Sequence, residues 1–314
     1  MFKNIYKSIK KSKKILIARH VNPDPDCISS SLGLCDLIKL KFPNKEVHVI
    51  GANVAKFKFI GTSEKMDESL YDADLLIVVD TPDMKRIDGI DISRFNNIIK
   101  IDHHPLIDNF GGIEYIDDKA SSCSEIIIEM CQKLKLPING EIAEKLYVGV
   151  ISDNGRFLYN YTTIKSFELV TWMLKTTNID FGKLYEPLYL RSIKELQLQS
   201  YLVENMIFCD NGFGYIKLTK EALKELEIDA SLAGHLVGEF VFIDELLCWA
   251  IFVEDEKSGL IRAHVRSRGP IINKVLETFN GGGHAYAGGA RISTWDEIDN
   301  LVYGIKVVVN EYKK

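Results

Sequence analysis

The stretch that decides the fold is Asn97-Ile98-Ile99-Lys100-Ile101-Asp102-His103-His104, an apolar run that ends in one aspartate and two histidines. Short runs rich in Ile and Val are typical of buried strands in a parallel sheet. We therefore expect Asp102, His103 and His104 where such a strand ends. Because ligands of parallel sheets collect at the carboxyl ends of the strands, this position indicates a functional site.

Three further acidic segments share this placement. The segment His20-Val21-Asn22-Pro23-Asp24-Pro25-Asp26 follows a strand-like run at residues 15–18, and Asp80 closes another at residues 75–79. Asp153 lies near the end of a predicted helix that begins after Asn139. The four segments are expected to converge on one edge of a sheet.

The length of 314 residues predicts about two domains. Strand-like runs alternate with helical patterns up to about residue 120, which indicates parallel βαβ units. We expect an α/β protein whose N-terminal parallel-sheet domain, residues 1–185, holds the metal ligands. A helical linker, residues 186–205, then leads to a smaller α/β domain, residues 206–314, that binds substrate.

Charge and cysteine usage limit the class of protein. A net charge of −5 argues against a surface for long nucleic acid, which needs many Lys and Arg contacts to phosphate. Six cysteines without a Cys-x-x-Cys pair favour reduced thiols. The longest apolar run near the N-terminus is too short for a signal core or a membrane span, so we expect a cytoplasmic protein without a membrane partner.

The clustered residues are suited to divalent cations. Two imidazoles and four carboxylates form a mixed nitrogen and oxygen donor set, which suits Mn²⁺ and admits Mg²⁺. Asp24, Asp26, Asp80 and Asp153 would balance two divalent cations, with Asp24 and Asp26 on different ions. A pair of divalent cations can activate a bridging water and hold both the attacking and the leaving oxygen of an in-line displacement at phosphorus. This chemistry is phosphoester hydrolysis. Asp102 is expected to orient a histidine in support.

Each acidic segment alone would be typical of a surface turn or a helix end. Four of them at element ends in one domain make that explanation improbable for the set. Cys27, beside the ligands, is expected to be a small buried thiol and not a ligand.

The C-terminal half contains a second group of candidate residues. Gly281-Gly282-Gly283-His284 is expected in a turn whose backbone N–H groups can approach an anion. Before it, Arg262 and Arg266 share one face of a predicted strand, and Arg268 lies in the following turn. Guanidinium groups can bind phosphate with two hydrogen bonds, although two arginines can also be the solvated face of an edge strand.

The chain resembles the Asp-His-His (DHH) phosphoesterases, a family that includes RecJ nucleases and nanoRNase/pAp phosphatases. The resemblance covers nearly the whole chain. It rests on the four N-terminal segments quoted above and, in the second half, on Arg266-Ser267-Arg268-Gly269 and Gly281-Gly282-Gly283-His284, which resemble the DHH-associated C-terminal domain. Pro25, Cys27 and Asn154 replace the glycine, alanine and threonine that are common in the family, and none of them removes a ligand.

The resemblance implies a role for each candidate residue. His20, Asp24 and Asp80 would bind one Mn²⁺, and Asp80 would bridge to a second. The second ion would be bound by Asp26, Asp80, His103 and Asp153. The catalytic residues would be Asp80, Asp102 and His104, and His104 would contact the scissile phosphate. Substrate would be bound by Arg262, Arg266, Arg268, Gly282, Gly283 and His284.

The implied activity is Mn²⁺-dependent hydrolysis of short oligoribonucleotides to nucleoside 5′-monophosphates and of pAp to AMP, by in-line attack of a bridging hydroxide. Cleavage of cyclic di-AMP or of pApA is an alternative within the same class. A non-catalytic nucleotide sensor is an alternative from another class, and a pyrophosphatase or polyphosphatase is a third. The expected partners are short nucleotides, and family members often form homodimers.

Overall fold

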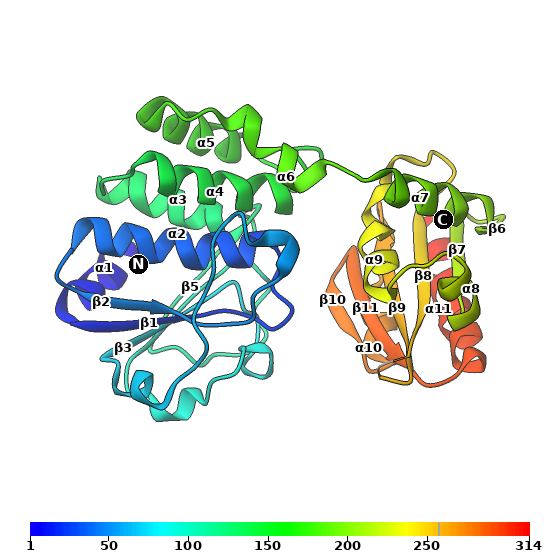
Figure 1. Ribbon diagram of the computed structural model, residues 1–314, viewed down its shortest axis with the longest axis horizontal. Helices are drawn as coiled ribbons and strands as arrows, with labels where there is room; N and C mark the ends of the chain where they lie inside the picture. The colour runs from blue at the N-terminus through cyan, green and yellow to red at the C-terminus, as the bar shows by residue number, and fades with distance from the viewer. Residues whose placement is uncertain (257) are drawn as a thin grey trace. The chain divides into compact units, whose positions relative to one another are not determined.

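The computed structural model describes residues 1–256 and 258–314. The chain separates into two compact units, Met1–Leu190 and Arg191–Lys314, each with its own sheet and core. The predicted fold class is confirmed, because the first unit contains a parallel sheet with helices and the second a mixed sheet with helices (Figure 1).

The sheet of the first unit has five parallel strands in the order β2-β1-β3-β4-β5. Its strands are β1 (Lys14–Ala18), β2 (Glu46–Val49), β3 (Leu75–Val79), β4 (Ile98–Asp102) and β5 (Ile113–Ile116). The chain passes from β1 to β2 on one side and then crosses to β3 on the other. The strand order reverses between β1 and β3, and ligands bind at the carboxyl ends of the strands at such a reversal.

Alternate residues of the strands belong to two different cores. Ile15 and Ile17 pack with the helices, whereas Leu16 and Ala18 pack with loops and short 3₁₀ helices on the opposite face. The helices of the unit are α1 (Phe2–Lys11), α2 (Pro25–Lys41), α3 (Cys123–Leu134), α4 (Gly140–Asp153), α5 (Ile164–Thr177) and α6 (Glu186–Tyr189). The 3₁₀ helices are η1 (Ala55–Phe57), η2 (Glu68–Asp72), η3 (Met84–Arg86), η4 (Ile92–Arg94) and η5 (Phe181–Leu184).

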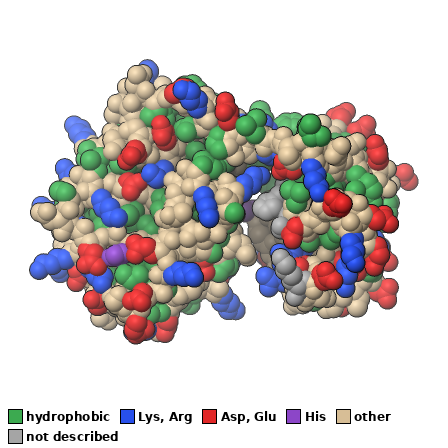
Figure 2. All heavy atoms as spheres, in the orientation of Figure 1, with side chains coloured by type: hydrophobic (Ala, Val, Ile, Leu, Met, Phe, Trp, Pro, Cys, Tyr) green, Lys and Arg blue, Asp and Glu red, His purple; other side chains and the backbone are tan. Residues whose placement is uncertain are grey.

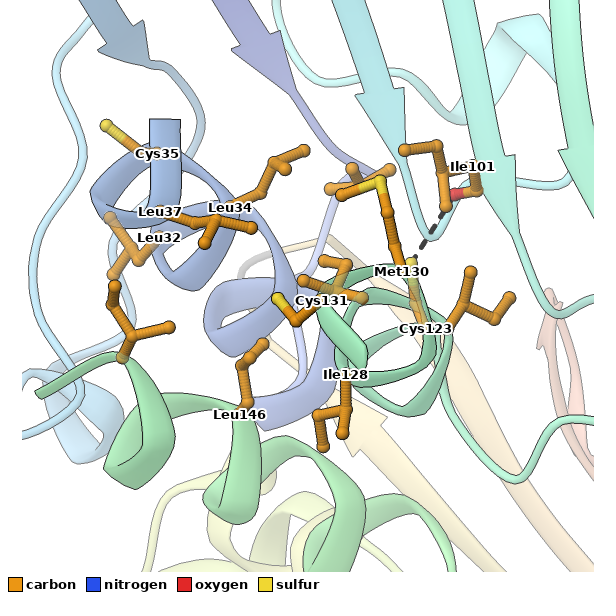
Figure 3. Close-up of a cluster of buried hydrophobic side chains, with 14 of the residues drawn as sticks. Leu32, Leu34, Cys35, Leu37, Ile101, Cys123, Ile128, Met130, Cys131 and Leu146 are labelled. Atoms are coloured by element: carbon orange, nitrogen blue, oxygen red, sulfur yellow. Dashed lines mark hydrogen bonds between the residues drawn. The ribbon is translucent and has the colours of Figure 1, made fainter. Parts of the chain in front are cut away.

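The helical side of this core ties α2, α3 and α4 to the sheet. Figure 3 shows Leu34 and Leu37 of α2, Ile128 of α3 and Leu146 of α4 among the packed side chains. At the start of α3, the Cys123 thiol donates a hydrogen bond of 3.4 Å to the carbonyl oxygen of Ile101 in β4 (Figure 3). The N-terminus of α3 is thereby fixed beside the end of β4.

The sequence pattern predicts a helix over residues 29–41, but helix α2 begins four residues earlier, at Pro25. The Asp24 carboxylate accepts a hydrogen bond from the Cys27 amide at 2.9 Å and so caps the helix. Pro25 occupies the first turn, where its missing N–H costs nothing. The segment predicted as a proline turn is therefore the N-terminus of a helix.

The second unit contains a six-stranded sheet in the order β10-β11-β9-β8-β7-β6, antiparallel except between β7 and β8. Its strands are β6 (Ile207–Cys209), β7 (Phe213–Leu218), β8 (Cys248–Asp255), β9 (Leu260–Ser267), β10 (Gly282–His284) and β11 (Ala287–Ile292). Its helices are α7 (Ile193–Glu204), α8 (Lys220–Glu225), α9 (Ala230–His235), η6 (Leu236–Phe242), α10 (Asn273–Glu277) and α11 (Trp295–Tyr312).

Both faces of this second sheet are covered. Val265 packs with Ile305 of α11 on one face, and Trp249 packs with Leu202 of α7 on the other. Helix α7 lies within the predicted linker and contributes to the core of the second unit. The predicted turn at residues 281–284 is instead mostly strand β10, which pairs with β11 as a hairpin.

The surface carries charges of both signs. On the face in Figure 2, Lys and Arg side chains are interspersed with Asp and Glu side chains. Among the described residues, the helices are too short or too polar to cross a membrane.

Candidate metal centre

Three strand ends place the predicted residues at the carboxyl edge of the first sheet. His20 follows the end of β1 by two residues, Asp80 follows β3 directly, and Asp102 is the last residue of β4. Because Val78 pairs with Ala18 and Val79 with Ile101, these ends are adjacent. The convergence expected from the sequence is present in the structure.

Asp80 lies at the centre of the group. Its side chain is only 1% exposed, with Oδ2 3.5 Å from His20 Nε2 and Oδ1 3.3 Å from His103 Nε2. Among the described residues, Oδ1 has no hydrogen-bond partner. The backbone of Asp80 has a φ of 51°, a left-handed conformation that is costly for residues other than glycine. A strained, buried carboxylate between two imidazoles is typical of a functional site.

The two imidazoles are oriented by backbone carbonyl groups. His20 Nδ1 lies 2.8 Å from the Val21 oxygen, and His103 Nδ1 lies 3.3 Å from the Ala120 oxygen. Because a carbonyl only accepts, each Nδ1 carries a proton, and Nε2 is the nitrogen that faces the carboxylates. An Nε2 that faces carboxylates is favourable either when it carries a proton or when a cation lies between them, so this donor set fits a bound metal ion.

Asp24 and Asp153 complete the two sides of the group. Asp24 Oδ2 lies 3.7 Å from His20 Nε2, and Asp153 Oδ2 lies 3.2 Å from His103 Nε2. Asp153 is the last residue of α4, so a helix end supplies this carboxylate and not a strand end.

Asp26 is held by the N-terminus of α3. Its buried carboxylate accepts hydrogen bonds from the amides of Cys123 at 2.7 Å and Ser124 at 3.0 Å. The positive end of a helix stabilises a carboxylate in this place. Gly149 of α4 allows this close packing, because a Cβ there would lie 2.6 Å from Asp26 Oδ1.

Three overlapping groups of possible ligand atoms result. Each group has its donor atoms within 4.8 Å of one another: His20, Cys27 and Asp80; Asp80, His103 and His104; and Asp26, His103 and Asp153. Asp80 and His103 each belong to two of them, and of the two only Asp80, with its two carboxylate oxygens, could bridge two ions.

The charged groups at this edge of the sheet shift one another's pKa values strongly. Burial and, to a smaller extent, the charge of Asp80 together raise the pKa of Asp26 to about 7. Burial also raises the pKa of Asp153 well above its ordinary value. Burial acts to raise the pKa of Asp80. The contacts of Asp80 with His103 and His20 outweigh burial and hold this pKa well below its ordinary value. So many buried carboxylates need positive charge nearby, which divalent cations would provide.

Asp102 pairs with His104, whose Nδ1 also lies 3.5 Å from Asp80 Oδ1. Asp102 is fully buried, and its Oδ1 accepts from His104 Nδ1 at 2.8 Å and from the His104 amide at 3.2 Å. Asp102 therefore orients His104, whereas the sequence alone left open which histidine it would contact.

The predicted arginines of the second unit differ in their surroundings. Arg262 pairs with Asp255 at 2.5 Å, near the β8–β9 turn. Arg266 donates to the carbonyls of Val265 at 2.9 Å and Gly288 at 3.4 Å. Arg268 donates to the carbonyl oxygens of residues 243, 244 and 246, so it holds a loop of its own unit.

The predicted glycines of the second unit form a tight hairpin. Gly282 pairs with Gly289, and His284 pairs with Ala287. Gly283 has a φ of +136°, and a Cβ on it would lie 2.4 Å from the Ala287 oxygen. Glycine is required at this position for the backbone conformation and for the space.

Two contributions to the site were not predicted. The amides of Cys123 and Ser124 hold Asp26, whereas the sequence Ser121-Ser122-Cys123-Ser124 by itself indicates only the cap of a helix. Lys100, a lysine in the middle of an apolar strand, is fully buried. Lysine is almost never fully buried unless it is paired, and this rule could have identified Lys100 in the sequence.

Comparison with known proteins agrees with this arrangement. Residues 14–150 match the DHH family, N-terminal domain, and residues 213–311 match the DHHA1 domain. A Streptococcus mutans protein described as a probable bifunctional oligoribonuclease and PAP phosphatase is 36% identical over 97% of this chain and 98% of its own length. The Bacillus subtilis bifunctional oligoribonuclease and PAP phosphatase NrnA is 32% identical over 95% of this chain and 96% of its own length.

A solved structure is similar over the whole length of this chain. The crystal structure of an exopolyphosphatase-related protein from Bacteroides fragilis has a TM-score of 0.90 and 27% identity, and the match covers 100% of this chain and 97% of that one. With its two domain matches and relatives above 30% identity over nearly the full length, the chain belongs to the DHH family.

Proposed function

We propose that the protein is a metal-dependent phosphoesterase that hydrolyses short oligoribonucleotides to nucleoside 5′-monophosphates and removes the 3′ phosphate of pAp. The observation that carries this proposal is the placement of buried Asp80 between His20 Nε2 and His103 Nε2 at the sheet reversal. The names and full-length similarity of the Streptococcus and Bacillus relatives support the choice of substrate.

Two divalent cations fit the donor atoms. One would be held by His20, Asp24 and Asp80. The other would be held by Asp26, Asp80, His103 and Asp153. We propose Mn²⁺, with Mg²⁺ as a substitute, because the set combines imidazole nitrogen with several carboxylate oxygens. When bound, the cations would supply Lewis acidity for the attack of water on phosphorus.

The chain's own residues would orient the substrate. Because Asp102 holds the proton on His104 Nδ1, Nε2 is the nitrogen that can contact the scissile phosphate, and it can donate a proton to the leaving oxygen when the ring carries protons on both nitrogens. In the second unit we propose contacts to a terminal phosphate or base. These would come from Arg262, Arg266, Arg268, Gly282, Gly283 and His284. Of the arginines, Arg266 is the strongest candidate because it lies beside the glycine hairpin.

Further properties stay predictions. They are a cytoplasmic location, a homodimer, and the division of the chain at residues 1–185, 186–205 and 206–314. The net charge of −5 supports short nucleotides over long nucleic acid as partners.

The test is a substrate panel with purified protein and Mn²⁺. It contains a five-residue RNA, pAp, pApA, cyclic di-AMP and pyrophosphate. Turnover of the RNA and of pAp is expected, and it is expected to disappear in Asp80→Ala but not in Asp91→Ala, which changes an exposed loop carboxylate. Turnover of cyclic di-AMP and pApA alone would favour the alternative substrates. No turnover of any nucleotide would overturn the proposal.

A further inference from the structure

Lys100 is a buried cation that the proposed reaction does not use. It lies in β4 between Ile99 and Ile101, and its side chain is fully buried. Removing a lysine from water is unfavourable unless hydrogen bonds and a counter-charge replace the lost solvation. The contacts of its ammonium group therefore indicate why a lysine occupies this strand.

The ammonium group joins two loops of the site. Nζ donates to the Pro82 carbonyl at 2.8 Å and to the Asp108 carbonyl at 3.1 Å. Pro82 lies two residues after Asp80, and Asp108 lies four residues after His104. The ring of Phe110 lies 4.8 Å from Nζ and adds a cation–π contact.

Its counter-charge is the carboxylate of Asp102. Lys100 Nζ lies 3.7 Å from Asp102 Oδ2, and both side chains are fully buried. This oxygen has no hydrogen-bond partner among the described residues, whereas Oδ1 accepts from His104 twice. The lysine thus attracts one oxygen of a carboxylate whose other oxygen holds the imidazole.

We propose that Lys100 is a positioning residue for His104 and acts through Asp102. Lys100 fixes the rotation of the carboxylate, Asp102 then holds the proton on His104 Nδ1, and Nε2 is turned to the phosphoryl group. The proposed effect of Lys100 on phosphoryl transfer rests on the proposed function. Its effect on the orientation of His104 does not depend on any substrate.

A purely structural role for Lys100 makes different predictions. If the lysine only ties the loops of Pro82 and Asp108 together, its removal disturbs the site whether or not residue 102 is charged. If it acts through Asp102, its removal matters only while that carboxylate is present. A double-mutant cycle between the two residues separates these roles.

The kinetic test uses Lys100→Met, which keeps the unbranched stem of the side chain and removes its ammonium group, together with Asp102→Asn and the double variant. Loss of such a supporting group is expected to lower kcat about 10- to 100-fold, with KM changed less than about twofold. In the Asp102→Asn background the same substitution is expected to cause no further loss. Equal losses of kcat in both backgrounds would overturn the proposal.

The second readout is independent of activity. Nitrogen-15 NMR of the metal-free protein reports which nitrogen of His104 carries the proton. The wild type is expected to show the Nδ1–H form, and Lys100→Met a mixture of both forms. Lys100→Gln, which keeps an N–H donor for the Pro82 carbonyl, is measured in parallel in case the methionine variant does not fold. If these substitutions leave the Nδ1–H form unchanged, the proposal is wrong, even if the wild type hydrolyses no nucleotide.

Discussion

Gly149 of α4 lies against Asp26 of α2 so closely that a Cβ on residue 149 would be 2.6 Å from Asp26 Oδ1. The same Cβ would be 2.1 Å from the hydroxyl oxygen of Ser124, the residue whose amide holds Asp26. Glycine in a helix interior costs about 1 kcal/mol relative to alanine. Its presence here is explained by the need to fit three helices around one buried carboxylate.

Gly149→Ala is therefore expected to damage the metal centre and the fold together. Overpacking of this kind destabilises a protein by about 1–3 kcal/mol. Any relief of the clash moves Asp26, so the affinity for Mn²⁺ should fall as well. Thermal unfolding and titration calorimetry with Mn²⁺ measure the two effects.

Helix α4 offers a matched control in Gly140, its first residue. A Cβ there would meet Ile179 at 3.5 Å, an ordinary van der Waals contact. Gly140→Ala should leave both stability and metal affinity unchanged or slightly improved. Equal behaviour of the two variants would contradict the packing argument.

Asp80→Asn tests the bridging carboxylate with little change of shape. Asparagine tolerates the left-handed conformation of this residue, so the fold should persist. The loss of one negative charge between two cations should lower Mn²⁺ affinity and kcat by at least about 100-fold. Calorimetry and initial rates measure this, with Asp91→Asn as a control in an exposed loop. An Asp80→Asn protein that still bound two Mn²⁺ tightly would exclude the bridge.

The pH dependence of stability can be predicted for Glu129 of α3, whose side chain is 5% exposed. Its carboxylate lies 2.5 Å from Lys133 Nζ and 2.9 Å from Lys165 Nζ. Burial acts to raise the pKa of Glu129, but the two lysines outweigh burial and lower it. The pKa of Glu129 in the folded protein lies below its value of about 4.3 in the unfolded chain. Ionised Glu129 therefore stabilises the folded protein fully above about pH 4.3, and this stabilisation is lost as the pH falls through the pKa of the folded state.

Glu129→Gln should therefore destabilise the protein by about 1 kcal/mol at pH 7, a modest value because both lysines are partly exposed. The difference from wild type should disappear at about pH 3. Urea unfolding at both pH values measures it, and Glu144→Gln, an exposed residue of α4, is the control. A constant difference at all pH values would show that packing, and not charge, is the cause.

Most of the first unit could be predicted because its signals are local. Apolar runs that end in Asp or His mark β1, β3 and β4, and parallel strands bring their carboxyl ends to one edge. Strand β5 was not predicted, since the sequence Ile113-Glu114-Tyr115-Ile116 is half polar and is recognised only by its pairing with β4. The early start of α2 depends on the cap by Asp24, a residue expected only as a metal ligand.

The contacts that could not be predicted join residues distant in the sequence. The amides that hold Asp26 come almost one hundred residues later, and no pattern near Asp26 signals them. The two arginines of Arg266-Ser267-Arg268 look equivalent in the sequence. The direction of each side chain is decided by the sheet, since Arg266 is on β9 and Arg268 follows it.

These two arginines give the last prediction. Arg268 donates to the carbonyls of Ile243 at 3.0 Å and Asp244 at 2.9 Å, and also to that of Leu246. Removing hydrogen bonds from a charged donor costs about 2–3 kcal/mol when the carbonyls lose their partner. Arg268→Ala should therefore lower the stability of the second unit in urea unfolding, and it should raise KM less than Arg266→Ala does.

Arg266→Ala should show the opposite pattern. Its contacts to the Val265 and Gly288 carbonyls lie beside the glycine hairpin, where a guanidinium group can bind a substrate phosphate. Loss of one such charged contact should raise KM for pAp about tenfold, with stability within about 1 kcal/mol of wild type. Steady-state kinetics and unfolding of both variants, compared with Lys274→Ala on an exposed helix, decide the assignment. If Arg268→Ala alone raises KM, the substrate contact belongs to Arg268, and its carbonyl contacts are not its main role.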